Sequence, residues 1–256
     1  MAQHFELLAA ADAQETQRWL VATPLIDLED PKLRLRVHAL TQLCRNEREK
    51  ALALYGFVRR FRLSTRYSLR PRTARQVFDA GRGSAGEKAT LLVAMLRIAG
   101  IPARIRYVTT SGELLRGVAG CLREADRPLL EVCLQGQWQR TDTYIFDAEL
   151  VATARQRLRE RGWEWGYGIH VAGSLAWNGR ESAYLGGVPI ECDLMVLREV
   201  GLVRDEIDYR ARSRPALHLH LLRLLHWGWA APVADRVRSR LRHPPAPASV
   251  QYHETY

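Results

Sequence analysis

The stretch that decides the fold is GRGSAGEKATLLVAMLRIAGIPAR, residues 81–104. Apolar residues occupy almost every position from Leu91 to Ala99, and a helix that is apolar all round is typical of a protein core. Ser84 is a favoured helix N-cap, while Gly100 and Pro102 would end the helix. The sequence therefore predicts a buried helix over residues 85–99, preceded by a Gly-rich turn at residues 81–83.

Helices are expected before this segment and strands after it. The stretch NEREKALALYGFVRRF, residues 46–61, opens with a capping asparagine, has acidic residues in its first turn and ends basic, which indicates an amphipathic helix. Further helices are expected at residues 15–21, 31–45, 73–80, 148–161 and 215–242, and strands at residues 103–109, 129–134 and 137–142. Residues 162–187 are expected to be irregular. This order predicts an α+β fold in which the buried helix packs on an antiparallel sheet with flanking helices.

Length and composition favour one large domain with an extension. We expect an N-terminal helical segment at residues 1–45, a core at residues 46–210, and a C-terminal helical extension with a Pro-rich tail at residues 211–256. No secretory signal pattern and no run of about 18 apolar residues is present, so we expect a soluble, cytoplasmic protein without a membrane partner. The four cysteines are widely spaced, which predicts reduced thiols.

The net charge of +10 comes almost entirely from scattered arginine, a bias typical of a GC-rich bacterial genome. No basic stripe or recognition motif accompanies the charge, so nucleic acid is not an expected partner.

Four stretches carry a family resemblance: EKALALYGFVRRFRLSTRY, TARQVFDAGRGS, GEKATLLVAMLRIAGIPAR and LEVCLQGQWQRTD. Together they resemble the transglutaminase-like superfamily of papain-like thiol enzymes over about residues 47–147. The resemblance implies a cysteine at the N-terminus of the buried helix, a histidine on the next long strand and an aspartate on the strand after it. A helix N-terminus stabilises a thiolate, while histidine moves the proton and aspartate orients the imidazole.

Carried over position by position, the resemblance puts the cysteine at Ala85, the histidine at Arg127 and the aspartate at Asp142. Alanine has no reactive atom, and arginine cannot act as a base at neutral pH. The chain has no histidine between His38 and His170, so no small shift restores the triad. We expect Arg127 and Asp142 to face each other across adjacent strands, either as a structural ion pair or as a binder of carboxylate or phosphate.

Neighbouring residues leave several roles open. Ser84 is better interpreted as a helix cap than as a nucleophile, because no base accompanies it. Glu87 could serve as an acid or base or could simply complement the helix dipole, and His170 is the nearest histidine for acid–base work. The helix N-terminus could offer N–H groups to an anion. Candidate ligand-binding residues are Ser84 and Gly86 at the helix N-terminus, Trp138, and the aromatic residues Trp163, Trp165 and Tyr167. The last three belong, with Trp177 and Tyr184, to a stretch at residues 162–187 that could form an aromatic wall for a ligand or could equally be core packing.

No cofactor and no metal site are expected, because the histidines at 218, 220 and 226 lack the i, i+4 spacing of a zinc pair. Three functions remain. The first is a divergent protein that uses its cleft for an acyl, amino-acid or peptide-like small molecule, by acyl-transfer or amide chemistry without a thiol if it is an enzyme. The second is a non-catalytic pseudoenzyme that binds a protein partner. The third is a thiol acyltransferase or peptidase with its cysteine changed to alanine by design, and Arg127 counts against it because removing a nucleophile does not require removing the base.

Overall fold

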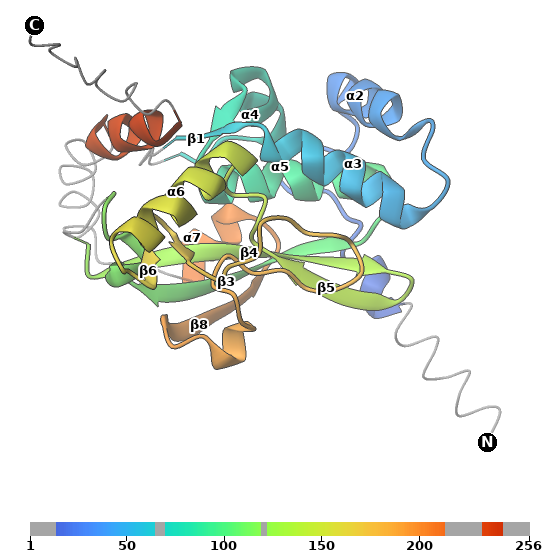
Figure 1. Cartoon of the computed structure of the whole chain (residues 1–256). Helices are drawn as coiled ribbons and strands as arrows, with labels where there is room; N and C mark the ends of the chain where they lie inside the picture. The colour runs from blue at the N-terminus through green and yellow to red at the C-terminus, as the bar shows by residue number, and fades with distance from the viewer. Residues whose placement is uncertain (1–13, 65–69, 119–121, 213–231, 243–256) are drawn as a thin grey trace, which may run out of the picture.

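The computed structural model describes residues 14–64, 70–118, 122–212 and 232–242. Helix α5 (Ala85–Ile98) lies at its centre, between a layer of helices and a four-stranded sheet (Figure 1). Helices α2 (Pro31–Thr41), α3 (Glu47–Arg59) and α4 (Ala74–Ala80) contact α5 on one side, and the sheet contacts it on the other. The predicted α+β fold is therefore confirmed.

The sheet has the order β5-β4-β3-β8 and every pairing in it is antiparallel. Its strands are β3 (Ala103–Ser111), β4 (Glu124–Leu134), β5 (Gln137–Thr141) and β8 (Val196–Val203). Two short ladders join β1 (Arg62–Leu63) to β2 (Arg82–Gly83) and β6 (Trp165–Gly166) to β7 (Ile169–His170). The remaining elements are α6 (Ala148–Glu160), α7 (Glu206–Arg212), two 3-10 turns at Gly112–Leu115 and Ile190–Cys192, and helical residues at 14–17 and 232–242.

Helix α5 forms where the local sequence signals place it. The Ser84 hydroxyl accepts a hydrogen bond from the Glu87 N–H at 3.2 Å, and the Glu87 carboxylate accepts one from the Ser84 N–H at 2.8 Å, which makes a reciprocal capping box. Leu91, Leu92 and Met95 are fully buried, and burial of each such side chain contributes about 1.5–3 kcal/mol. After the helix, Gly100 takes a positive φ of 79°, which glycine adopts without strain.

A buried lysine joins α5 to its surroundings. The Lys88 ammonium donates hydrogen bonds to the backbone carbonyls of Arg59 at 3.2 Å, Phe61 at 2.8 Å and Ile145 at 2.9 Å. Burial lowers the pKa of Lys88 to about 7. The ammonium therefore fixes the first turns of α5 against the end of α3 and the segment that follows β5.

The structure differs from the sequence predictions at several elements. Strand β8 and helix α7 lie within residues 188–214, where the sequence predicted no element, and β4 begins at Glu124 instead of residue 129. Pro128 lies within β4 beyond the end of β5, where only β3 pairs with the strand, so its missing N–H is tolerated. Helix α2 ends at Thr41 instead of residue 45, since Leu43 is 89% exposed and gains nothing from helical packing. The helix expected at 15–21 covers only residues 14–17, and of the helix expected at 215–242 only residues 232–242 lie within the described residues.

The helical residues 232–242 pack on the core. Ala234 and Leu241 are buried, and the Arg242 guanidinium lies 2.5 Å from the Asp147 carboxylate at the start of α6. Among the described parts of the chain, none of the helices is both long enough and apolar enough to cross a membrane.

Candidate functional site

The N-terminus of α5 carries Ser84, Ala85, Gly86 and Glu87. Arg72 donates two hydrogen bonds to the Glu87 carboxylate, at 2.7 and 2.6 Å, while the same carboxylate caps the helix. Glu87 is buried, and the ion pair with Arg72 adds to its role as a cap. The structure thus places Glu87 in an inward-facing structural network, whereas Ser84, Ala85 and Gly86 are half-buried.

Helix α7 covers this N-terminus from the other end of the chain. A Cβ added at Gly86 would lie 2.6 Å from the Tyr107 hydroxyl and 3.4 Å from Oε2 of Glu206, so both groups approach the helix backbone closely. The Tyr107 ring stacks on Tyr209 of α7 at 3.8 Å between centroids. The α7 segment therefore occupies the space next to Gly86.

Only one of the two carboxylate oxygens of the buried Glu206 has a hydrogen-bond partner among the described residues. Its Oε1 accepts a hydrogen bond from Arg210 at 2.5 Å, and its Oε2 has no hydrogen-bond partner among the described residues. Burial raises the pKa of Glu206, and Arg210 offsets part of that rise. Glu206 has no local sequence signal, because its contact with Gly86 joins residues 120 positions apart.

Arg127 and Asp142 form the expected ion pair. Nη2 of Arg127 lies 2.5 Å from Oδ2 of Asp142, without the angles of a hydrogen bond, and the side chains are 9% and 1% exposed. The other oxygen of Asp142 accepts a hydrogen bond from the Leu185 N–H at 2.8 Å. Burial raises the pKa of Asp142, while the Arg127 charge and the Leu185 N–H oppose the rise.

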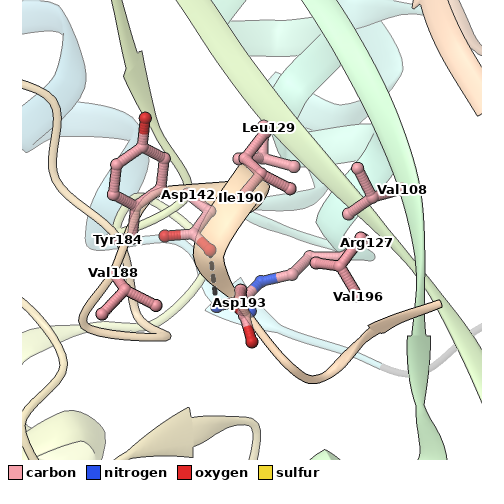
Figure 2. A pocket seen from close by; sticks show the side chains of 9 residues that line it. All are labelled: Val108, Arg127, Leu129, Asp142, Tyr184, Val188, Ile190, Asp193 and Val196. Carbon is pink, nitrogen blue, oxygen red and sulfur yellow. Dashed lines mark ion pairs between the residues drawn. The ribbon is translucent and has the colours of Figure 1, made fainter. Parts of the chain in front are cut away.

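The segment that crosses this pair makes a small pocket. Figure 2 shows the carboxylate and guanidinium beneath the segment that carries Tyr184, Ile190 and Asp193. The space inside has room for about one water molecule. The pocket walls combine the sheet and the covering segment: Val108, Arg127, Leu129, Asp142, Tyr184, Val188, Ile190, Asp193 and Val196.

The register of the sheet separates this pocket from α5. Strands β3 and β4 pair without interruption, with Tyr107 opposite Pro128 and Val108 opposite Arg127. Successive residues of a strand point to opposite faces, and the Tyr107 hydroxyl lies against Gly86 of α5. Val108 and Arg127 therefore point away from α5, so Ala85 and the ion pair lie on opposite faces of the sheet.

The aromatic candidates do not gather around either place. The Trp138 ring lies 3.9 Å from the Arg104 guanidinium, and the Trp163 ring lies 3.6 Å from that of Arg116. Tyr167 is buried, and Trp165 lies 4.4 Å from the half-buried His170 ring. Nδ1 of His170 accepts a hydrogen bond from the Ala172 N–H at 3.1 Å, so the ring caps a turn. Tyr184, which belongs to the aromatic stretch at residues 162–187, lines the pocket.

No cluster of three or more metal-ligating side chains occurs among the described residues. Cys44, Cys133 and Cys192 are free thiols, and Cys121 lies outside the described residues.

Comparisons with known proteins give a family-model match and two solved structures to which parts of this chain are similar. Residues 36–143 match the family model described as "Transglutaminase-like superfamily". One similar solved structure is a "Putative Cysteine Protease" from Cytophaga hutchinsonii, with 15% identity, a TM-score of 0.46, and coverage of 76% of this chain and 48% of that chain. Another is a "putative protease" from Parabacteroides distasonis, with 20% identity, a TM-score of 0.34, and coverage of 51% of this chain and 25% of that chain.

The chain thus spans about half or less of the solved proteins that it resembles. No curated protein sequence matches it significantly. The matched residues, 36–143, contain α5 and strands β3 to β5 and are similar to a transglutaminase-like core.

Proposed function

We propose that this chain is a transglutaminase-like pseudoenzyme that binds a protein partner and performs no thiol chemistry. The observation that carries the proposal is the ion pair between Arg127 and Asp142, the two positions to which the family resemblance assigns its histidine and aspartate, on the face of the sheet away from Ala85. A guanidinium stays protonated at neutral pH, so it cannot take a proton from a nucleophile.

The rest of the geometry supports a non-catalytic role. Ala85 offers no nucleophile, and it lies on the other side of the sheet from Arg127. The pocket beside Arg127 has room for about one water, which leaves no space for a peptide or an acyl group. Glu87 and Asp142 already engage Arg72 and Arg127, so neither carboxylate is poised as a general base.

Restoration of the family residues tests the proposal. Amide and ester hydrolysis and amine incorporation into casein would be measured for the native chain, for Ala85→Cys, and for Ala85→Cys combined with Arg127→His. We expect background rates from all three, because a histidine at 127 would point away from a thiol at 85. A paired thiol and imidazole would raise the rate of the double variant above Ala85→Cys by about 10²–10⁴-fold, and such a rise would overturn the separation of the two positions.

The native chain provides a second test. The turnover of the native chain is compared with that of heat-unfolded protein and of the variants Glu87→Gln and Asp142→Asn. If the native chain turns over substrate above the unfolded background and either variant loses that activity, the chain is an enzyme with non-thiol chemistry, and the pseudoenzyme proposal is wrong.

A second candidate function is binding of an amino-acid or peptide-like small molecule at the start of α5. The unpartnered Oε2 of Glu206, beside Gly86 and Tyr107, favours it because a ligand N–H could satisfy a buried acceptor. Free amino acids and dipeptides would then raise the melting temperature of the native chain and not of Glu206→Ala. If no such compound shifts the native protein, this second candidate fails.

A further inference from the structure

Four arginines form an exposed surface on the helical side of the molecule, remote from the sheet. They come from four elements: Arg36 on α2, Arg60 at the C-cap of α3, Arg62 on β1 and Arg82 on β2. Helices α2 and α4 and strand β1 all lie on the side of α5 away from the sheet (Figure 1). We call these four residues the arginine surface.

Backbone pairing brings two of these arginines together, and the Phe57 ring brings the other two together. Arg62 and Arg82 are direct partners in the parallel β1–β2 ladder. The guanidinium groups of Arg36 and Arg60 lie 5.6 and 6.0 Å from the centre of the half-buried Phe57 ring. Since β2 runs straight into Ser84, the surface begins at the turn that opens α5.

These four cations lack the carboxylates that other arginines of the chain have. Within the described residues, none of the four side chains forms an ion pair, whereas the nearby Arg34 pairs with Glu29 and Arg75 pairs with Asp30. Asp79 of α4 is bound by Lys32 at 2.5 Å and by Arg75 at 2.8 Å, so it does not neutralise the surface. Like charges gathered without counter-charges weaken the folded state and attract an anionic partner.

We propose that the arginine surface docks an acidic segment of a partner protein. The proposal rests on the pseudoenzyme function and names the chemistry of the partner. Guanidinium groups bind carboxylates through two parallel hydrogen bonds, and the half-buried Phe57 and Phe78 rings beside Arg36 add apolar surface.

Single-stranded nucleic acid fits this surface less well. It is bound by stacking bases on open aromatic faces, and the Phe57 face is already covered by Arg36 and Arg60, while Arg36 also lies 5.9 Å from the Phe78 ring.

The test uses the full chain and a fluorescein-labelled, glutamate-rich peptide as the probe, with fluorescence anisotropy as the readout. The controls are the same peptide with glutamine for glutamate, a single-stranded DNA of similar charge, and vesicles containing phosphatidylserine. The surface variant is R36Q/R60Q/R62Q/R82Q. A matched control variant removes four exposed arginines that also form no ion pair in the described residues and lie elsewhere: R45Q/R123Q/R159Q/R180Q.

We expect the surface variant to bind the peptide at least about tenfold more weakly and the control variant to stay within about threefold, since each exposed ion pair strengthens binding about twofold. Equal losses in both variants would overturn the proposal, as would equal binding of the glutamine peptide. Tighter binding of DNA or vesicles that depends on the same four arginines would reassign the surface to that ligand.

Thermal unfolding of both variants distinguishes loss of binding from loss of folding. If the fourfold variant unfolds, R36Q/R60Q and R62Q/R82Q are measured separately, and each should lose part of the affinity. The binding test and the hydrolysis tests can fail separately. Turnover by the native chain would refute the pseudoenzyme function even if the peptide binds at the arginine surface. Failure of the peptide to bind would refute only the acidic partner.

Discussion

Replacement of Arg127 by methionine is the most direct test of how the site is built. The substitution keeps an unbranched side chain and removes the charge that faces Asp142. The Asp142 side chain is 1% exposed, and without Arg127 its carboxylate would keep the hydrogen bond from the Leu185 N–H but face no cation. Removing one member of a buried ion pair leaves an uncompensated charge, which costs about 3–5 kcal/mol of unfolding free energy.

This loss is large enough to measure in two ways. For a chain of 256 residues, each kcal/mol lowers the melting temperature by about 2–4 °C, so Arg127→Met should lower it by roughly 6–20 °C. Urea titration should show a matching shift of the midpoint with an unchanged slope.

The loss of unfolding free energy in Arg127→Met should also depend on pH. The raised pKa of Asp142 would rise further without Arg127. An acid whose folded pKa is raised contributes stability below its unfolded pKa, about 4, and loses that contribution as pH rises through the folded pKa. The deficit of the variant should therefore be small near pH 4 and reach its full size above the folded pKa.

Two controls bracket the result. Arg198→Met removes an exposed pair with Glu124, 3.0 Å apart and about half exposed, and should cost less than about 1 kcal/mol. Arg127→Met combined with Asp142→Asn should recover most of the loss, because no buried charge remains. If Arg127→Met costs no more than Arg198→Met at neutral pH, Arg127 is not a structural partner of Asp142, and a ligand-binding role becomes the better interpretation.

Two further predictions concern α5. The depressed pKa of Lys88, about 7 against about 10.4 in the unfolded chain, means that the native protein should gain stability as pH rises from about 7 to 10. Urea unfolding of Lys88→Met should lose that pH slope, and a slope equal to that of the native chain would contradict the assignment. Gly86→Ala puts a Cβ 2.6 Å from the Tyr107 hydroxyl and should cost about 1–3 kcal/mol, whereas Gly56→Ala, with nothing within 4 Å of its added Cβ in α3, should gain about 0.5–1 kcal/mol. Equal effects of the two alanines in thermal unfolding would show that α7 does not press on α5.

Local signals explain how much of the fold could be predicted from sequence. The capping box at Ser84 and the stop at Gly100 act within a few residues, so α5 was predicted to within one residue at its end. Strand β8 was missed because its sequence, VLREVGLV, has charged residues at 198 and 199 and a glycine at 201, and because its pairing with β3 is long-range. Helix α7 has seven residues and no apolar stripe, and Ile207 is 42% exposed.

The candidate site could be predicted only as far as local sequence signals reach. Motif spacing located Arg127 and Asp142 along their strands, and the ion pair between them follows from that spacing. Which face of the sheet Arg127 occupies depends on the register that sets Val108 opposite Arg127 and turns Tyr107 toward α5. The cover over Gly86 depends on Glu206, which the chain brings back from a distant segment. Neither fact has a local signal.

The ion pair with Arg127 also limits what Asp142 can do. Asp142 lies just after β5, which ends at Thr141, and its two oxygens contact two other segments. Oδ2 pairs with Arg127 on β4, and Oδ1 accepts a hydrogen bond from the Leu185 N–H of the covering segment. A ligand that reached this carboxylate would have to displace that segment and break the buried pair, at a cost of about 3–5 kcal/mol before any new contact formed. An arrangement of this kind is most stable when closed, which is why the exposed arginine surface, rather than the carboxylate beneath the covering segment, is where we expect a partner to bind.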